Sequence, residues 1–410
     1  MKRLLYIGGA SAAGCLAYAQ RSSIKTWYDG NKGEQQAWAE EKFNIRKQRH
    51  NVIRDVYQAN AFLKNEDRNE TVIPNEREAF IGVYDGHSGK DCSVFLRTYL
   101  IHQFRYHLHQ LEVMQMKYTQ NPQHIREKLM GNPEKWETPL LKNLFDINNY
   151  VPKLLTLSFD VVDKVFIKDG ESSNDAKALR AGAVGVLAYI VDNKIFVANT
   201  GDALALLCRQ NDKGAFEAKM LSVEHRADLD EQEVRKRFPH DPEIVKNGRI
   251  KGMLQPSRAF GDVLFKKAYC HPLRNEIAVL KENYFKIWEP PYIINTPAIS
   301  QHQIEFGKDK YLVVGSDGLF DDFTTRDILQ TLQYYDEHPE VRSIHANPAQ
   351  FLLHQLLKST NNKPNDDITI VVVQFNDEEI DRSHIPYYGY QIPFPQQVQY
   401  QRKLFSLLNE

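Results

Sequence analysis

Several short apolar runs in this chain end abruptly in glycine and acidic residues. Ile81–Tyr84 leads directly into Asp85-Gly86-His87-Ser88-Gly89, and YLVVGSDG (311–318) and DITIVVVQF (367–375) are apolar over the length of a strand. β-Branched and aromatic residues in such runs predict buried strands, and the glycines predict where they stop. A turn is the ordinary interpretation of an Asp-Gly pair after a strand, so any function has to be argued from further residues.

Other segments predict a hairpin and several helices. Residues 183–209 contain two β-branched runs separated by Asp192-Asn193-Lys194, which predicts a β-hairpin. Helical spacing of apolar residues predicts helices in 325–335, 348–358, Leu154–Phe166 and Leu229–Phe238, and Ser93–Leu100 resembles the opening of another. The regular strand–helix–strand alternation of a doubly wound sheet is missing. We therefore expect an α+β fold of two packed, mainly antiparallel sheets with helices on their outer faces.

Composition narrows the function classes. The chain has 410 residues, 42% of them hydrophobic, which is enough for one large or two ordinary domains with a sizeable core. Its 52 Lys and Arg nearly balance its 53 Asp and Glu, so nothing predicts nucleic acid as a partner. The four cysteines are scattered without paired spacing, which argues against a disulfide scaffold or a thiolate zinc site.

The first residues differ from the rest. Basic residues precede the first acid, Asp29, and the apolar stretch Leu4–Ala19 is shorter than the roughly 20 residues of a membrane-spanning helix. A basic, acid-free segment rich in Ser and Ala is typical of mitochondrial targeting, with a secretory signal or a marginal anchor as alternatives. We predict a targeting segment at 1–28, a polar lead-in at 29–58, one domain at 59–376 and an extension rich in Tyr, Gln and Pro at 377–410.

Acidic residues recur near the ends of the predicted strands. They are Glu66, Asp67, Asp85, Asp202, Asp317, Asp366 and Asp367. Each alone is more often a turn residue than a ligand, so only the whole set carries an argument. Carboxylates gathered at one end of a sheet repel one another and require a positive charge nearby. Oxygen ligands without Cys or many His favour Mg²⁺ or Mn²⁺, and two such ions activate a water and stabilise a phosphoryl group.

Six motifs occur in an order that identifies a family. They are EDR (66–68), VYDGHSG (83–89), VANTGD (197–202), PSRAFGD (256–262), VVGSDGLFDD (313–322) and NDDITIVVVQF (365–375). The series resembles the metal-dependent protein phosphatases of type 2C and spans residues 66 to 375. Each motif alone is weak, whereas six in order are specific. The resemblance implies the α-β-β-α sandwich of that family.

The resemblance also implies a set of metal ligands. Asp85 would bridge two Mg²⁺ or Mn²⁺ ions, and the carbonyl group of Gly86 would bind one of them. The other ligands implied are Asp317, Asp366, Glu66 and Asp67, with Asp202 as a ligand of a third, weaker ion.

The implied chemistry is hydrolysis of phosphoserine and phosphothreonine by direct attack of a metal-activated water. His87 would be the general acid that protonates the leaving oxygen, alongside the metal-bridging Asp85. Asp262 and Asp321 would orient waters or nearby groups. Many members of that family bind the substrate phosphate with an Arg a few residues before the Glu-Asp pair. This chain has no Arg there, and Lys64 or Arg68 could substitute for it.

The expected substrate follows from a narrower similarity. RIKGMLQPSRAFGDVLFK (249–266) and PPYIINTPAI (290–299) resemble the branch of the family that acts on the mitochondrial pyruvate dehydrogenase complex. We expect that complex as the phosphoprotein partner, no stable membrane span, and a location in the mitochondrion, in the matrix. Two alternatives stay open: another mitochondrial substrate such as the branched-chain ketoacid dehydrogenase complex, or a non-catalytic regulatory protein on the same fold.

Overall fold

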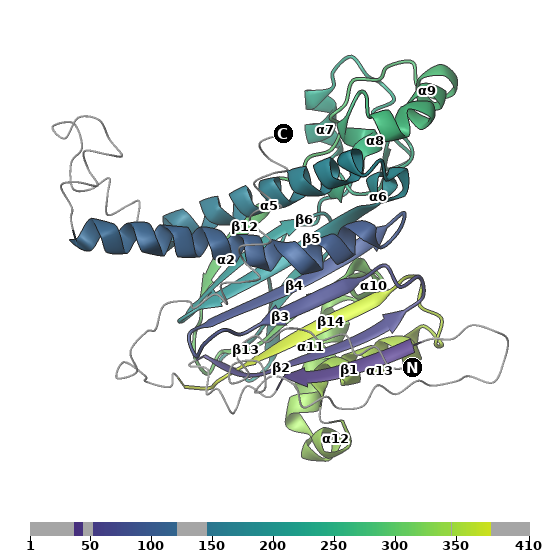
Figure 1. The fold of residues 1–410 in the computed structure, drawn as a ribbon. Helices are drawn as coiled ribbons and strands as arrows, with labels where there is room; N and C mark the ends of the chain where they lie inside the picture. Colours follow the sequence, from purple (N-terminus) through teal and green to yellow (C-terminus); the bar gives the residue numbers. More distant parts are fainter. Residues whose placement is uncertain (1–36, 44–51, 121–145, 346, 379–410) are drawn as a thin grey trace, which may run out of the picture.

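The computed structural model describes residues 37–43, 52–120, 146–345 and 347–378 (Figure 1). The predicted targeting segment at 1–28 lies outside the described residues, as does all but the start of the predicted extension at 377–410. In the described part of the chain, no helix combines the length and the apolar character needed to cross a bilayer.

Two antiparallel sheets form the centre of the molecule. The first runs β1(Ala37–Phe43), β2(Ile53–Phe62), β14(Ile368–Phe375), β13(Asp309–Gly315), β7(Leu204–Gln210), β8(Phe216–Met220). The second runs β12(Ala298–Gln303), β6(Lys194–Thr200), β5(Gly182–Val191), β4(Glu78–His87), β3(Arg68–Val72), and β11(Phe260–Gly261) also pairs with β5. Every pairing between neighbouring strands of these sheets is antiparallel.

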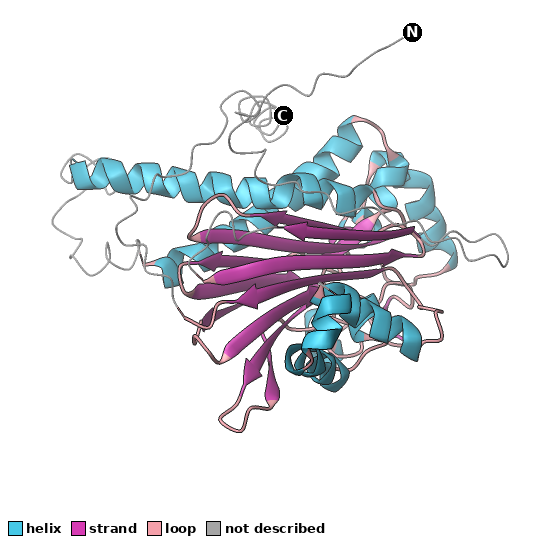
Figure 2. Cartoon of the chain, turned by 90° about the horizontal axis from the view of Figure 1, so that it is seen from below, coloured by secondary structure: helices cyan, strands magenta, loops and turns pink. Residues whose placement is uncertain are grey.

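The sheets pack face to face between helices (Figure 2). Apolar side chains of both sheets, among them Val83, Val186 and Val371, fill the space between the sheets. The outer face of the second sheet is covered by α2(Asp91–Gln120) and α5(Ile147–Ser172), and that of the first by α11(Thr325–Glu337) and α13(Pro348–Ser359). This arrangement confirms the expected α+β fold, an α-β-β-α sandwich.

The segment between β8 and β12, residues 221–297, is called the insert below. It carries α7(Glu231–Arg237), β9(Val245–Lys246), β10(Arg249–Ile250), β11, α8(Val263–Lys266), a short 3₁₀ turn (His271–Leu273) and α9(Arg274–Asn283). Its helices lie at the top of Figure 1, above the edge where β4 and β5 meet the helix layer. The insert therefore overhangs one end of the sandwich.

Local sequence signals account for most of the element boundaries. β5 and β6 form the predicted hairpin, and Asp192 at its turn has a φ of 50°. Helix α11 begins with a reciprocal cap between Thr324 and Asp327, and α13 begins after Asn347, whose side chain accepts a hydrogen bond from the backbone N–H of Gln350. The four helices predicted from apolar spacing are present as α5, α7, α11 and α13, and Ser93–Leu100 lies in α2.

Two features differ from simple expectation. The Asp85-Gly86 pair lies inside β4, which continues to His87, because Gly86 and His87 pair with the small residues Ala183 and Gly182 of β5. In addition, β1 and the first part of β2 bring residues of the 29–58 range into the first sheet. The expected boundary at residue 59 falls inside β2, and the division into domains stays a prediction.

None of the remaining elements changes this picture. α6(Ala176–Arg180) leads into β5, α10(Asp317–Phe320) follows β13 directly, and α12(Pro339–Ile344) connects α11 to α13. Because α10 begins at Asp317, the first residue after Ser316, the acidic residue is held where a strand turns into a helix.

Candidate active site

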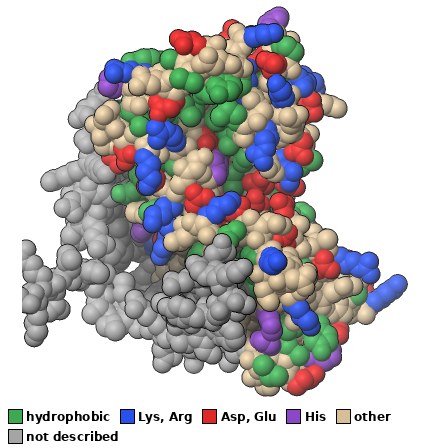
Figure 3. Space-filling view, turned by 90° about the vertical axis from the view of Figure 1, so that its right-hand side faces the viewer, with side chains coloured by type: hydrophobic (Ala, Val, Ile, Leu, Met, Phe, Trp, Pro, Cys, Tyr) green, Lys and Arg blue, Asp and Glu red, His purple; other side chains and the backbone are tan. Residues whose placement is uncertain are grey.

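Strand register brings the acidic loops to one edge of the sandwich. Ala61 of β2 pairs with Ile368 of β14, so the loop of residues 63–67 lies beside Asp366 and Asp367. Gly315 of β13 pairs with Ile370 of β14, which places Asp317 at the same edge. This edge is on the right of Figure 1 and faces the viewer in Figure 3, where Asp and Glu side chains gather near the middle.

A single buried carboxylate shapes the loop that carries Glu66 and Asp67. Asp367 is 1% exposed, and its two oxygens accept hydrogen bonds from five consecutive backbone N–H groups. The donors are Leu63, Lys64 at 2.6 Å, Asn65 at 3.1 Å, Glu66 at 2.6 Å and Asp67 at 3.2 Å. Backbone N–H groups that converge in this way form a concave anion site, here occupied by a side chain of the same protein. From sequence, Asp367 is recognisable only as an acid before a strand, and this role is not.

Four carboxylates form the centre of the site. The carboxyl groups of Asp85 and Asp317 share a hydrogen bond, and Asp67 and Asp202 are close enough to act on them electrostatically. Burial raises the pKa of Asp85 and of Asp67 well above the usual range, and the neighbouring negative charges raise both further. Burial, assisted by Asp317, also raises the pKa of Asp202 to about 7. This crowding makes a nearby positive charge strongly favourable.

His87 is held by an aspartate from the insert. Its Nε2 atom lies 2.7 Å from Oδ2 of Asp262, which is 3% exposed and has a φ of 51°. Burial lowers the pKa of His87, but the charge and the hydrogen bond of Asp262 outweigh that effect, and the pKa is raised overall. Only glycine fits at Gly182 beside this pair, because a Cβ there would lie 2.2 Å from Oδ2 of Asp262 and 2.3 Å from Nε2 of His87.

Glu66 connects the acidic loop to the segment after β4. Its Oε1 atom accepts a hydrogen bond of 2.6 Å from the backbone N–H of Gly89, and its carbonyl oxygen accepts one from the hydroxyl of Ser93. Gly86 allows this close approach, since a Cβ on it would lie 2.7 Å from the Glu66 carbonyl oxygen. The loop that carries Glu66 and the segment that directly follows His87 are therefore fixed to each other.

Asp321 and Asp366 lie at the rim of the cluster and face basic side chains. Oδ2 of Asp366 is 2.6 Å from Nζ of Lys64. Oδ1 of Asp321 is 3.8 Å from Nη1 of Arg226, which belongs to the insert. The pKa of Asp321 is raised overall. Burial is the main cause, Arg226 opposes it, and the negative charge of Asp366 adds to it. Arg226 is not recognisable from sequence, because no motif within its own segment points to it.

The donor set suits hard divalent cations. Oδ2 of Asp67 and Oδ1 of Asp317 are buried and have no hydrogen-bond partner among the described residues. Within those residues, no three His, Cys, Asp or Glu side chains are already arranged to enclose a single ion. Mg²⁺ is usually held by only one or two carboxylates together with waters, so buried, unpartnered carboxylate oxygens fit it.

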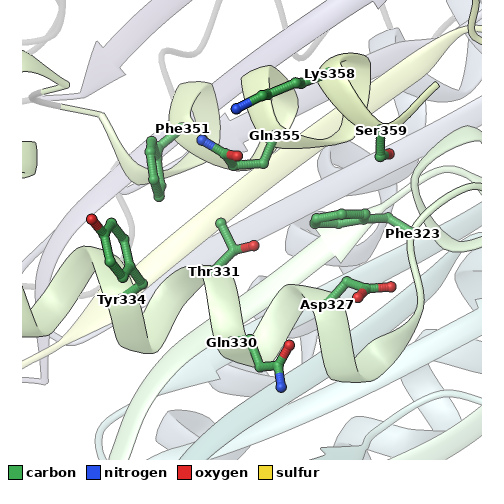
Figure 4. Close-up of a pocket in the computed structure, with 9 residues that line it drawn as sticks. All are labelled: Phe323, Asp327, Gln330, Thr331, Tyr334, Phe351, Gln355, Lys358 and Ser359. Carbon is green, nitrogen blue, oxygen red and sulfur yellow. The ribbon is translucent and has the colours of Figure 1, made fainter. Parts of the chain in front are cut away.

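Two cavities of the described structure lie away from these residues. One of about 580 Å³ lies between α11 and α13, and its lining includes Phe323, Tyr334 and Lys358 (Figure 4). Another of about 510 Å³ lies beside α5 and is lined by Leu157, Asn295 and others. Neither contains a residue of the acidic cluster, so charge and geometry rather than depth single out the candidate site.

Known proteins with similar sequences are phosphatases. The chain is 31% identical over 287 residues to "[Pyruvate dehydrogenase [acetyl-transferring]]-phosphatase 1, mitochondrial" of Saccharomyces cerevisiae, an alignment that covers 66% of this chain and 47% of the yeast protein. It is 28% identical over 346 residues to "Probable protein phosphatase 2C 40" of Arabidopsis thaliana, covering 77% of this chain and 66% of that protein. The chain thus spans about half the length of the yeast protein and about two thirds of the plant protein.

Fold comparison agrees with the sequence comparison. The serine-threonine phosphatase 2C from Toxoplasma gondii superposes with a TM-score of 0.54 at 18% identity, over 80% of this chain and 96% of that one, which supports the fold alone. The sequence profile of "Protein phosphatase 2C" matches residues 47–340, more than half of the chain. The motifs, the antiparallel sandwich and this match agree, and the chain belongs to the protein phosphatase 2C family.

Proposed function

We propose that this protein is a metal-dependent serine/threonine phosphatase that acts on a mitochondrial phosphoprotein, the pyruvate dehydrogenase complex. The observation that carries the activity is the convergence of Asp85, Asp317, Asp67 and Asp202 at one edge of the two sheets. Such a cluster is costly without cations, and a phosphoryl group is the substrate that divalent cations in this arrangement serve.

The ligands would come from both sheets. They are Asp85, the carbonyl group of Gly86, Asp317, Asp366, Glu66 and Asp67, with Asp202 for a third ion. When bound, Mg²⁺ or Mn²⁺ ions supply Lewis-acid activation of water and charge stabilisation of the phosphoryl oxygens. Asp367 holds the loop that presents Glu66 and Asp67, so the protein positions two of these ligands through its backbone.

His87 would donate the proton that the leaving oxygen needs. A serine or threonine alkoxide is a poor leaving group, and a positioned general acid contributes about 10²–10⁴-fold to the rate. Asp262 favours the protonated ring and restrains its orientation through the contact at Nε2. Asp321 would orient groups at the rim, where Arg226 offsets its charge.

Two observations support the substrate and the location. The yeast relative is named as a mitochondrial phosphatase of pyruvate dehydrogenase. Residues 1–28 of this chain are basic and free of acids, as mitochondrial targeting segments are. Together they support the pyruvate dehydrogenase complex as the substrate and the matrix as the place of action.

The first test measures hydrolysis of p-nitrophenyl phosphate by the full chain in Mn²⁺ or Mg²⁺, with and without EDTA. We expect chelation to abolish the rate and Asp317→Asn to lower it by more than the ~10–100-fold typical of residues that act behind a metal ligand. Asp377→Asn is the matched control, because that carboxylate pairs with Lys310 at the surface. An unchanged rate in Asp317→Asn would refute the proposed ligand set.

The same preparation then decides the substrate. Initial rates are compared on the phosphorylated pyruvate dehydrogenase complex and on the phosphorylated branched-chain ketoacid dehydrogenase complex. We expect a strong preference for the first. Equal or reversed rates would leave a phosphatase of another substrate, and the absence of any metal-dependent rate would favour a non-catalytic regulatory role.

A further inference from the structure

We propose that the cavity between α11 and α13 binds a segment of this same chain, the proline- and tyrosine-rich residues 385–395. The cavity is called the α11–α13 groove below. The proposal does not depend on the phosphatase activity, because the groove contains no residue of the acidic cluster. The chemistry of the groove walls, the place where the described chain ends, and the composition of the residues that follow support it.

One face of each helix lines the α11–α13 groove (Figure 4). The lining of about 580 Å³ of space includes, from α11, Gln330, Thr331 and Tyr334 and, from α13, Phe351, Gln355 and Lys358. Residues three and four positions apart lie on the same face of a helix, so each helix presents one stripe to the groove. Gln330, Tyr334 and Lys358 are exposed, so the groove opens to solvent.

The groove combines aromatic rings with polar groups that have no partner. The rings of Tyr334 and Phe351 lie 6.4 Å apart at an angle of 16°, and Tyr334 is 47% exposed. The side chains of Gln330, Gln355 and Lys358 form no hydrogen bond or ion pair with any other described residue. Aromatic-lined grooves bind proline-rich peptides in the polyproline II conformation. That conformation has no internal hydrogen bonds, so its carbonyl groups can accept bonds from amide and ammonium donors.

The described chain ends beside one end of this groove. Gln374, near the end of β14, and Asp336, near the end of α11, both contact the hydroxyl group of Tyr311, at 3.4 Å and 2.9 Å. Tyr334 lies two positions before Asp336 in α11. Three positions after Gln374, the carboxylate of Asp377 pairs with a lysine of β13 at 2.6 Å. The chain therefore leaves the described fold beside the end of the groove that carries Tyr334.

Residues 385–395 have a suitable composition and length. They read IPYYGYQIPFP, so proline and aromatic residues make up most of the segment. α11 has 13 residues and, at about 1.5 Å per residue, is roughly 20 Å long. In polyproline II, with about 3.1 Å per residue, roughly seven residues span that length. The segment can therefore follow the whole groove, and residues 379–384 remain for the turn back along it.

Attachment to the same chain favours this occupant over a separate protein. A segment joined by a short linker has an effective concentration in the mM range at its binding site. At about 1 mM, an intrinsic Kd of about 0.1 mM keeps the segment bound for roughly 90% of the time. Proline also restricts φ before binding, which lowers the entropy cost of ordering the segment. A weak contact between groove and peptide is therefore sufficient.

The test measures chymotrypsin cleavage of the full chain after the aromatic residues of 385–395, by mass spectrometry of the released peptides. Thr331→Arg places a long side chain in the groove at a half-buried position, and arginine is a good helix former. We expect the parent chain to be cleaved about tenfold more slowly than Thr331→Arg, because cleavage follows the population of the unbound segment. Thr98→Arg, the same substitution at an exposed position on α2, is the matched control and should behave as the parent chain does.

Phe394→Ala tests the other side of the contact without altering the described fold. We expect it to raise cleavage after Tyr387 and Tyr390 toward the rate in Thr331→Arg. The double variant should add little, because both substitutions remove the same contact. Gln399→Ala, outside the segment, is the control and should leave cleavage unchanged.

The outcomes separate the occupants. Equal cleavage of the parent chain, Thr331→Arg and Phe394→Ala would refute the proposal. Protection that persists in Thr331→Arg would also refute it, because the segment would then bind elsewhere. Protection that increases with protein concentration would overturn it as well, since the groove would hold the segment of a second copy. If circular dichroism shows that Thr331→Arg does not fold, the comparison of Phe394→Ala with Gln399→Ala decides, and equal cleavage of those two refutes the proposal.

Discussion

The role of each acidic residue at this edge depends on the groups that surround its side chain. Asp366 and Asp367 are adjacent and chemically identical, yet one faces Lys64 at the rim and the other is buried under five backbone N–H groups. Asp366 lies in a bend and Asp367 directly precedes β14, so the two adjacent side chains meet different neighbours. Sequence patterns predicted that acids gather at this edge, but not which of the two is structural.

Glu70 on β3 provides a pH-dependent test at this scale. Burial raises its pKa to about 7, against the lowering effect of Arg97 and Arg105. Since an unfolded glutamate has a pKa of about 4.3, the native state binds the extra proton between these values, and stability falls as pH rises from about 4.5 to 7. We expect Glu70→Gln to increase the free energy of unfolding by roughly 2–3 kcal/mol at pH 8 and by little at pH 4.5.

Urea unfolding at the two pH values checks this prediction. Glu282→Gln is the control, because it is the same substitution at an exposed position on α9. An equal gain from Glu70→Gln at both pH values would show that packing rather than ionisation causes the effect.

At the level of elements, the local patterns predicted the helices and the hairpin but not the extent of β4. Apolar spacing and capping residues act within one turn, so α11 and α13 could be placed from sequence. Asp85-Gly86 looked like a strand end because Asp and Gly commonly form turns. The strand continues because Gly182 and Ala183 of β5 leave room beside it, and this partner is about a hundred residues further along the chain.

A second prediction, at the scale of elements, concerns the loop of residues 63–67 and the carboxylate of Asp367 that holds it. Asp367→Asn keeps one acceptor oxygen but turns an amide N–H₂ toward backbone donors, so several N–H groups lose their partner. We expect a loss of about 3 kcal/mol in the free energy of unfolding with EDTA present, from buried donors left unsatisfied. Chemical denaturation measures it, with Asp377→Asn as a surface control that should change stability by less than about 0.5 kcal/mol. A loss no greater than in the control would contradict the structural role of Asp367.

At the scale of the whole molecule, the sequence predicted two packed sheets covered by helices. It did not predict the strands in residues 29–58. The abundance of short buried strands and the lack of regular βα alternation predicted the sandwich, which the structure and the family confirm. Residues 29–58 are polar and charged, so no strand was predicted there. β2 becomes recognisable only from its pairing with β14 in the structure. The motifs predicted acidic residues at the ends of strands. Only the pairing register of the strands shows that these residues lie close together.

A truncation experiment tests the extent of the domain. A chain that begins at residue 59 lacks β1 and most of β2, and with them most of the pairing between β2 and β14. Loss of a strand inside a sheet exposes both its neighbour and the apolar layer beneath it. We expect this chain to be insoluble or to show no cooperative unfolding by circular dichroism, whereas a chain that begins at residue 30 should unfold cooperatively. Cooperative unfolding of both would place the boundary at residue 59 after all.

The bond between the loop of residues 63–67 and Asp367 also has a consequence for biosynthesis. Its partners are as many as 304 positions apart, so the loop leaves the ribosome long before the carboxylate that shapes it. Until that carboxylate emerges, five N–H groups lack their acceptor and β2 lacks β14 beside it. A nascent chain, or one cut short before Asp367, therefore cannot present Glu66 and Asp67 correctly. The loop therefore takes its observed conformation only after Asp367 has been synthesised.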